Sequence, residues 1–322
     1  MGFVTEGTLR ANGLEFAFAE AGDKQAPLIL LLHGFPECWA SWRFQLPVLA
    51  ESGFRAVAPD LRGYGFSSAP TSIEAYSQCE LSDDVAGIIG ALGYQDAVLV
   101  GHDWGAALAW QVARRHPGKV RAVAALSVPY GGQAPEPPTR TMRRKFADQF
   151  FYMLYFQQPD LPEQELARDP RDSLRRIFHA WSASADAEWF LRARRGGGFL
   201  DGMPLPDSTP HWMREVDLDF YVARFQHSGF RGPINWYRAM DLYWEQTRDE
   251  PAQNWIIPCP ALYLVGDRDP VRLMNQKAIK RMPDYIPQLR ASHVIADCGH
   301  WTQMEQAAEV NRYLLGFIEE VG

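Results

Sequence analysis

The chain has 322 residues, of which 47% are hydrophobic and 22% are charged, as in an ordinary globular protein. This apolar content excludes disorder for most of the chain, because its burial can offset the loss of chain entropy. The net charge of −7 argues against nucleic acid as a partner, since such binding depends on clustered Lys and Arg side chains that neutralise phosphates.

Targeting and membrane-spanning signals are not evident in the sequence. The first 24 residues carry four acidic side chains and no apolar core segment, so we expect no signal peptide. The longest aliphatic run, Leu28–Leu32, is far shorter than the roughly 20 residues that span a bilayer. The cysteines lie far apart, without the spacing of zinc ligands. We therefore expect a cytoplasmic protein with no membrane partner.

Over the first 130 residues, short apolar runs alternate with helical patterns. Several runs are apolar on both faces, as parallel strands covered by helices are. A helix expected at 78–92 opens with Ser77 and Glu80, the spacing of a capping box. The alternation predicts a doubly wound α/β sheet. The strands that we expect are 14–21, 27–33, 54–59, 97–101 and 120–128.

The pattern changes after residue 130. From 133 to 251 no strand is evident, and the segment is helical in pattern and rich in Trp and Tyr. Strand patterns return at 261–265 and 292–295, and an amphipathic helix is expected at 306–318. We therefore predict a core in two parts, 1–130 and 252–322, with an inserted helical cap at 131–251. The cap would cover the carboxyl edge of the sheet, where ligands bind in open α/β folds.

The sharpest motif is Gly101-His-Asp-Trp-Gly105, between an expected strand and an expected helix at 104–115. It has the G-x-Nu-x-G form of a nucleophile elbow, with Asp103 where a serine hydrolase carries Ser. An Asp that only caps a helix is the commoner explanation of such a pattern in isolation. The position between a buried strand and a helix favours the nucleophile.

Partners for Asp103 follow in the chain order of this kind of fold, acid before His. Asp269 lies in the loop after the expected strand 261–265, and His300 lies in the loop after 292–295. We therefore expect both residues to lie at the same edge of the sheet as Asp103. The alternative acids are Asp267 and Asp297.

An oxyanion hole is expected from the backbone N–H groups of Phe35, in the loop 33–37, and of Trp104. A carboxylate nucleophile can displace a leaving group from sp³ carbon and form an alkyl ester. Water activated by His300 would then hydrolyse that ester. The sequence thus predicts hydrolysis of an epoxide or an alkyl halide rather than an esterase or a protease.

Six segments resemble the soluble epoxide hydrolases of the α/β-hydrolase superfamily, in particular the hydrolase domain of the mammalian-type enzyme and its bacterial relatives. The resemblance covers nearly the whole chain. It implies an α/β-hydrolase fold: a mostly parallel eight-stranded sheet flanked by helices, with an inserted helical cap. The segments are His33-Gly-Phe-Pro-Glu37, Asp60 to Pro70, Gly101 to Gly105, Tyr152-Met-Leu-Tyr-Phe-Gln157, Phe230 to Arg238 and Gly299-His-Trp-Thr-Gln303.

The resemblance implies that Asp103 is the nucleophile, His300 the base and Asp269 its orienting acid. It implies that two cap tyrosines, Tyr152 and Tyr237, donate hydrogen bonds to the epoxide oxygen. Phenols have an ordinary pKa near 10 and stay protonated at neutral pH. The implied reactants are a small apolar epoxide and water, with no cofactor and no metal. The separate phosphatase domain of the mammalian-type enzyme is not expected.

Two alternative functions remain. A haloalkane or haloacid dehalogenase would use the same Asp103, although a halide has no need of the paired tyrosines. A non-catalytic ligand-binding relative would have no need of nucleophile, base and acid together. The sequence leaves open which epoxide is natural and whether the chain is a monomer or a homodimer. We expect Tyr155, Tyr221 and Tyr243 to serve in packing. The aromatic residues Trp181, Trp189, Trp212, Trp236 and Trp244 indicate an apolar substrate pocket, but the sequence leaves open which of them line it.

Overall fold

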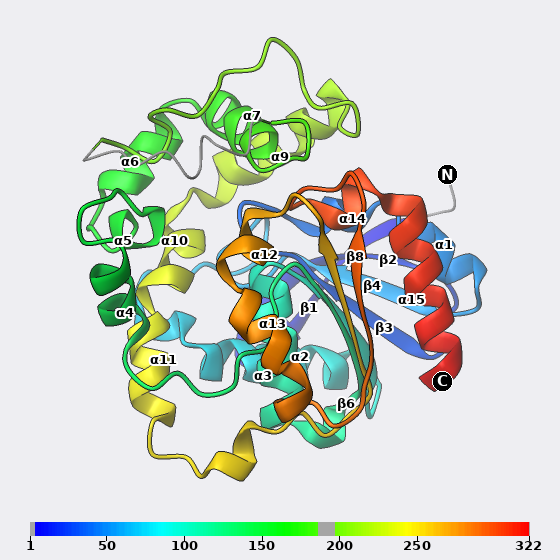
Figure 1. The fold of residues 1–322 in the computed structure, drawn as a ribbon. Coiled ribbons are helices and arrows are strands. Elements are labelled where there is room, and N and C mark those ends of the chain that lie inside the picture. The colour runs from blue at the N-terminus through cyan, green and yellow to red at the C-terminus, as the bar shows by residue number, and fades with distance from the viewer. Residues whose placement is uncertain (1–3, 186–196, 322) are drawn as a thin grey trace.

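An eight-stranded sheet forms the core of the protein (Figure 1). The computed structural model describes residues 4–185 and 197–321. The strands lie side by side in the order β1-β2-β4-β3-β5-β6-β7-β8, with β2 antiparallel to both neighbours and the other pairs parallel. This confirms the expected mostly parallel sheet. The bounds are β1 Thr5–Ala11, β2 Leu14–Ala21, β3 Leu28–Leu32, β4 Arg55–Pro59, β5 Ala97–His102, β6 Val120–Leu126, β7 Ala261–Gly266 and β8 Leu289–Ile295.

Helices cover both faces of the sheet, so β3, β4 and β5 are buried along their whole length. On one face Ile29 and Leu31 share a core with α1 (Leu46–Glu51) and α15 (Ala307–Val321). On the other face Leu30 and Leu32 share a core with α2 (Gln78–Ala91) and α3 (Trp104–Arg115). Neighbouring side chains of one strand therefore stabilise different cores, each fully buried Leu or Ile by about 1.5–3 kcal/mol.

Strand β1 was not predicted from the sequence. It lies at the edge of the sheet, and four of its seven residues are exposed, so its apolar pattern is weak. It pairs with β2 through a tight turn at Asn12 and Gly13, which have φ values of 48° and 75°. Asn-Gly is the strongest short-range signal for such a hairpin turn, and it could have located β1.

The start of α2 differs in detail from the capping box that the sequence predicts. Ser77 is the N-cap, but its side chain accepts the N–H of Cys79 at 3.3 Å. The backbone N–H of Ser77 donates to the Glu74 carbonyl oxygen at 3.3 Å. The reciprocal bond from Glu80 is therefore not needed, because the preceding turn already provides the acceptor.

Helices without strands make up the described parts of residues 131–251, which lie to one side of the sheet (green to yellow in Figure 1). The chain then returns to the sheet and adds short helices between and after β7 and β8, namely α12 (Pro270–Met274), α13 (Gln276–Tyr285) and α14 (Thr302–Glu305). The helices on the side of the sheet are α4 (Pro138–Lys145), α5 (Tyr152–Tyr155), α6 (Leu161–Arg168), α7 (Pro170–Ala180), α9 (Glu215–Ser228), α10 (Arg231–Arg238) and α11 (Met240–Thr247).

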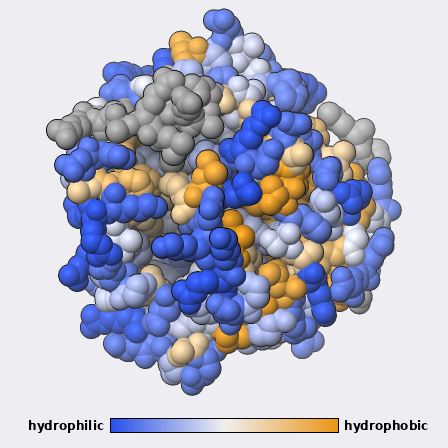
Figure 2. Space-filling view, viewed as in Figure 1, coloured by the Kyte–Doolittle hydropathy of each residue, from blue (hydrophilic) through white to orange (hydrophobic). Residues whose placement is uncertain are grey.

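Polar side chains surround separate apolar groups on the face drawn in Figure 2. No helix among the described residues combines the length and the apolar character needed to cross a bilayer. All four cysteines lie in the described part of the chain, and each is a free thiol.

Candidate active site

Asp103 lies at the turn between β5 and α3, where its φ of 52° is rare for a residue other than glycine. Two glycines make this turn feasible. A Cβ on Gly101 would collide with the Gly105 carbonyl oxygen, and a Cβ on Gly105 would collide with the Leu32 carbonyl oxygen. The tight turn presents the Asp103 side chain at the carboxyl edge of the sheet.

The loop after β3 closely approaches this carboxylate. The Phe35 N–H donates to Asp103 Oδ1 at 2.9 Å, and a Cβ on Gly34 would collide with the Asp103 side chain. Trp104 is the first residue of α3, where a backbone N–H has no intrahelical acceptor. One of the two expected oxyanion donors, Phe35, thus contacts Asp103, and the other lies at the adjacent helix N-terminus.

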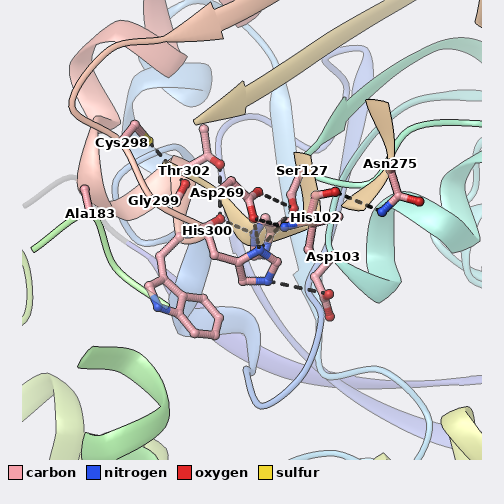
Figure 3. Close-up of polar contacts among 12 residues, drawn as sticks. His102, Asp103, Ser127, Ala183, Asp269, Asn275, Cys298, Gly299, His300 and Thr302 are labelled. Carbon is pink, nitrogen blue, oxygen red and sulfur yellow. Dashed lines mark hydrogen bonds and ion pairs between the residues drawn. The ribbon is translucent and has the colours of Figure 1, made fainter. Parts of the chain in front are cut away.

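His300 lies between two carboxylates that come from different loops (Figure 3). Its Nδ1 is 3.2 Å from Asp269 Oδ1, and its Nε2 is 3.6 Å from Asp103 Oδ2. Asp269 is fully buried, and its Oδ1 also accepts the Val271 N–H at 2.9 Å. The fold therefore brings the expected nucleophile, base and acid into one chain of contacts.

The two carboxylates determine the charge of His300. Burial lowers the pKa of His300, but the charges and hydrogen bonds of Asp269 and Asp103 outweigh burial and raise this pKa to about 10. The imidazole is therefore protonated at neutral pH, with Asp269 making the largest contribution and Asp103 adding to it.

The two alternative acids have other partners. Asp267 Oδ1 accepts the Cys298 N–H at 3.0 Å. Asp297 is largely exposed and pairs with Arg268 at 2.7 Å. Of the three acids, Asp269 alone contacts His300 in the described structure.

Ser127 joins this cluster, although sequence reasoning missed it. Its Oγ donates to Asp269 Oδ2 at 2.6 Å and lies 3.0 Å from His300 Nδ1. The expected strand 120–128 would have placed Ser127 inside the sheet, whereas β6 ends at Leu126 and Ser127 has a φ of 72°. A polar residue that ends a buried apolar run was the available signal.

A second group of buried polar residues, also missed, lies behind the site. Glu37 accepts the Gly34 N–H at 2.7 Å and the Gln303 side-chain N–H at 2.9 Å, and it contacts His102 Nδ1 at 2.8 Å. His102 Nε2 donates to the His300 carbonyl oxygen at 2.8 Å. Burial raises the pKa of Glu37, but its contact with His102 contributes to lowering that pKa to about 2. A carboxylate thus connects the loop after β3 with the loop that carries His300.

The loop that carries His300 is also bonded to helix α7. The His300 N–H donates to the Trp181 carbonyl oxygen at 2.9 Å, and the Trp301 indole N–H donates to the Phe178 carbonyl oxygen at 2.8 Å. Glu305 accepts three backbone N–H groups from the two sides, those of Ala183 at 2.8 Å, Trp301 at 3.0 Å and Gly299 at 3.2 Å.

Tyr152 and Tyr237 approach the sheet edge from two different helices. Tyr152 begins α5, Tyr237 lies in α10, and their ring centroids are 5.9 Å apart. Together with Asp103 and His300 they line one cavity. Burial raises the pKa of both phenols well above the usual range, so both keep their protons at neutral pH.

Side chains next to the tyrosines in sequence hold α5 and α10 together. The Gln157 side-chain N–H donates to the Tyr237 carbonyl oxygen at 3.0 Å. Arg238 donates to the Phe156 carbonyl oxygen at 3.0 Å and forms a buried ion pair with Glu163 at 2.5 Å. These bonds explain why the tyrosines occur in longer motifs rather than alone.

The rest of the cavity lining is apolar or aromatic, and the cavity volume is about 20 Å³, roughly the room for one water molecule. The lining side chains therefore pack closely around this space. The other lining residues are Phe35, Ile177, Trp181, Phe199 and Trp301.

Of the four candidate tryptophans that the structure describes, Trp181 alone lines this cavity. Trp236 is buried and donates to the Arg62 carbonyl oxygen at 3.0 Å. Trp212 and Trp244 are not part of the lining, and Trp189 lies outside the described residues.

The three tyrosines assigned to packing do not line the cavity either. Tyr221 shares a hydrogen bond of 2.8 Å with Ser41, and Tyr243 accepts one from Arg114 at 3.1 Å. Tyr155 is buried in the same hydrophobic core as Tyr152 and Tyr237.

Known proteins resemble this chain in both sequence and fold. Residues 27–307 match the family described as the alpha/beta hydrolase fold. The chain is 40% identical over 320 residues to epoxide hydrolase A of Mycobacterium tuberculosis, covering 99% of this chain and 98% of that protein. It is 41% identical to bifunctional epoxide hydrolase 2 of Sus scrofa, of which it spans 54%.

A crystal structure of epoxide hydrolase A from Mycobacterium thermoresistibile superposes with a TM-score of 0.94 at 39% identity, covering 99% of each chain. An epoxide hydrolase from an endophytic Streptomyces superposes with a TM-score of 0.93 at 36% identity, covering 98% of this chain and 95% of that one. The chain therefore belongs to the α/β-hydrolase fold family and, within it, to the epoxide hydrolases.

Proposed function

We propose that this chain is an epoxide hydrolase that converts an apolar epoxide to a vicinal diol through a covalent ester on Asp103. The single observation that supports this most is the composition of one cavity. A carboxylate and a histidine lie on the sheet side, and two protonated phenols, Tyr152 and Tyr237, lie on the cap side. An epoxide needs both sides, because its leaving oxygen stays attached to the substrate and requires donors opposite the nucleophile.

In the first step, Asp103 displaces the epoxide oxygen from one ring carbon. Its Oδ1 is held by the Phe35 N–H, which leaves Oδ2 as the attacking atom. The ring C–O bond breaks as the new C–O bond forms, and the alkoxide takes a proton from Tyr152 or Tyr237. The product is a neutral hydroxyalkyl ester of Asp103.

Before the second step, the imidazolium proton of His300 passes to the tyrosinate that the first step leaves, so the imidazole is neutral and the phenol is restored. His300 then removes a proton from water, which attacks the ester carbonyl carbon, while the Phe35 and Trp104 N–H groups stabilise the oxyanion and Asp269 stabilises the imidazolium. The bond from the carbonyl carbon to the substrate oxygen then breaks, the leaving diol takes a proton from His300, and the Asp103 carboxyl returns one to His300. Formation of the ester removes the charge of Asp103, which is one of the two charges that raise the pKa of His300. The first step thus lowers the proton affinity of His300 before the second step requires it as a base.

Residues 131–251 serve as a cap in this proposal, with 1–130 and 252–322 as the two parts of the core. The cap supplies Tyr152 and Tyr237, and the apolar lining favours a small apolar epoxide. A reducing cytoplasm suits the four free thiols.

The experiment that tests the function is a single turnover of styrene oxide by excess enzyme in ¹⁸O-labelled water. Through the ester, the first diol takes its new oxygen from Asp103 and carries ¹⁶O. Label in that first diol would mean direct attack by water and would refute the nucleophile. Absence of diol together with halide release from alkyl halides would support a dehalogenase instead, and tight binding of the epoxide without product would support a receptor.

A further inference from the structure

Ser127 directly follows strand β6, and its side chain contacts two members of the catalytic cluster, Asp269 and His300. Strand β6 lies between β5 and β7. The residue that follows β6 therefore lies between Asp103, which follows β5, and Asp269, near the end of β7. His300 comes from beyond β8, the next strand along. Figure 3 shows Ser127 pointing toward Asp269 and His300.

The backbone of Ser127 is fixed on both sides. Its N–H donates to the Leu264 carbonyl oxygen at 2.9 Å, and its carbonyl oxygen accepts the Tyr263 hydroxyl at 2.8 Å. The residue is fully buried and has a φ of 72°. A non-glycine residue in this region is strained, so the surrounding hydrogen bonds hold Ser127 in a conformation that its backbone does not prefer.

The donor and acceptor roles of the Ser127 hydroxyl can be assigned in only one way. A serine hydroxyl has a single proton, and Asp269 Oδ2, at 2.6 Å, is a carboxylate oxygen that can only accept. The Ser127 oxygen therefore accepts at its other contact, the 3.0 Å approach to His300 Nδ1. This requires a proton on Nδ1, and in the neutral imidazole it leaves Nε2, on the side of Asp103, free to accept a proton.

We propose that Ser127 is a positioning residue for the hydrolysis of the ester: its hydroxyl fixes the tautomer and orientation of His300 and disperses the charge of Asp269. The inference rests on the proposed function. Nδ1 is 3.2 Å from Asp269 Oδ1, longer than the roughly 2.7–2.9 Å of a strong charge-assisted bond. Asp269 alone therefore orients the ring only loosely, and Ser127 supplies the second contact.

Removal of the Ser127 hydroxyl should raise the pKa of His300. The titratable groups around His300 are Asp103 and Asp269 at the contacts described and the His102 ring at 4.8 Å. Glu305 holds the N–H groups of the two residues that flank His300, and Tyr152 lines the same cavity. Without the Ser127 donor, the charge of Asp269 acts more fully on Nδ1 and stabilises the imidazolium. The variant base then becomes active only at higher pH.

The test is Ser127→Ala, studied by rapid quench under single-turnover conditions with styrene oxide. We expect formation of the ester to stay within about threefold of wild type. We expect its hydrolysis to slow by about tenfold or more, as part of the roughly 10²–10⁴-fold contribution of a general base. The pH at which hydrolysis reaches half its maximum rises.

Two further variants separate the hydroxyl from the backbone. Ser127→Gly also removes the hydroxyl but relieves the strain at positive φ, so it should fold at least as well as Ser127→Ala and lose hydrolysis equally. Ser173→Ala removes a buried hydroxyl that bonds the Leu166 carbonyl oxygen at 3.0 Å in the cap, and both steps should stay at wild-type rates.

Three results would overturn the proposal. These are wild-type hydrolysis and pH dependence in both Ser127 variants, equal slowing of both steps, or slow hydrolysis in Ser127→Ala with normal hydrolysis in Ser127→Gly. A wild-type enzyme that forms no ester would instead refute the proposed function, and the two failures are thereby distinguished.

Discussion

The sheet edge and the cap hold their reactive side chains in different ways. At the edge, Asp103, Ser127, Asp269 and His300 each follow a strand. Hydrogen bonds from the Phe35 backbone N–H and among the side chains fix their positions. In the cap, ring packing surrounds Tyr152 and Tyr237, with centroid distances of 5.9 Å between them and 5.0 Å from Tyr237 to the Trp104 ring. Bonds from the Gln157 and Arg238 side chains to backbone carbonyl oxygens hold their helices together.

This difference separates two tasks. In the proposed mechanism, the edge keeps a nucleophile and a base aligned through two steps, so contacts of defined length suit it. In the same proposal, the cap presents two donors to an oxygen of the substrate, so their hydroxyl groups have to remain available. A substitution at the edge should then affect a specific step, whereas substitutions in the cap should affect ring opening in proportion to the donors lost.

The largest effect is expected from Asp103→Asn. The amide is a poor nucleophile, so diol formation should fall by about 10⁴-fold or more, as when catalytic nucleophiles are removed from other hydrolases. The measurement is diol formation at saturating styrene oxide. Asp297→Asn is the matched control, because Asp297 lies at the same edge but pairs with Arg268. Similar rates in the two variants would remove Asp103 from the mechanism.

His300→Gln should separate the two steps. Ester formation needs no base, whereas ester hydrolysis should slow by about 10²–10⁴-fold, so the alkylated protein accumulates and is detected by intact mass. His293→Gln, at a distant ring stacked on Tyr313, should behave as wild type. A normal steady-state rate in His300→Gln would contradict the role of the base.

Tyr152→Phe and Tyr237→Phe test the cap. Each single variant should slow ring opening by about tenfold, because the second donor remains, and the double variant by about 10²–10³-fold. The measurement is the rate of ester formation in a single turnover. Tyr243→Phe controls for loss of a phenol, since Tyr243 bonds Arg114 away from the cavity. Undiminished ring opening in the double variant would show that neither phenol is the donor.

Glu305→Gln should loosen the contact between α7 and the loop of His300. The amide retains one acceptor for three backbone N–H groups, and unsatisfied donors cost about 1–3 kcal/mol of unfolding free energy. Faster hydrogen exchange at the amides of Ala183, Gly299 and Trp301 is the measurement, with Glu309→Gln, on the exposed face of α15, as control. Unchanged exchange would mean that other contacts suffice.

The smallest predicted effect is a change in the pKa of His300. His300 has a pKa raised to about 10 by Asp269 and Asp103, so its charge stabilises the fold fully below the ordinary pKa of about 6.5. That stabilisation is lost as the pH rises through about 10. Asp103→Asn removes one charge, as the ester does, and the His300 ring followed by NMR should then titrate at a lower pH. An unchanged titration would mean that Asp269 alone determines the charge.

The sequence predicted those parts of the structure that follow from strand patterns and chain order. Asp103, Asp269 and His300 follow buried apolar runs, and parallel strands bring such positions to one edge. Ser127 was not predicted as a site residue, because residues 120–128 have the pattern of one continuous strand. The position at which β6 ends depends on bonds to β7, which the sequence pattern does not show. Strand β1 was not predicted, because an edge strand is half exposed and its apolar pattern is weak.

In the cap, the sequence alone could not rank the aromatic residues. Tyr152 and Tyr237 were selected by resemblance to a family, since several other tyrosines have the same local pattern. Among the tryptophans, Trp181 lines the cavity and Trp212 does not, because that depends on how helices cross. The division at 131 and 251 stays a prediction.

The bonds between helix α7 and the loop after β8 restrict the route of substrate and product. The His300 N–H is held by the Trp181 carbonyl oxygen, so any motion that lifts α7 also pulls on the imidazole. An opening that displaced α7 would therefore disturb the base of the proposed second step. An opening on the side of α5 and α10 would leave the His300 bonds intact, and those two helices carry Tyr152 and Tyr237.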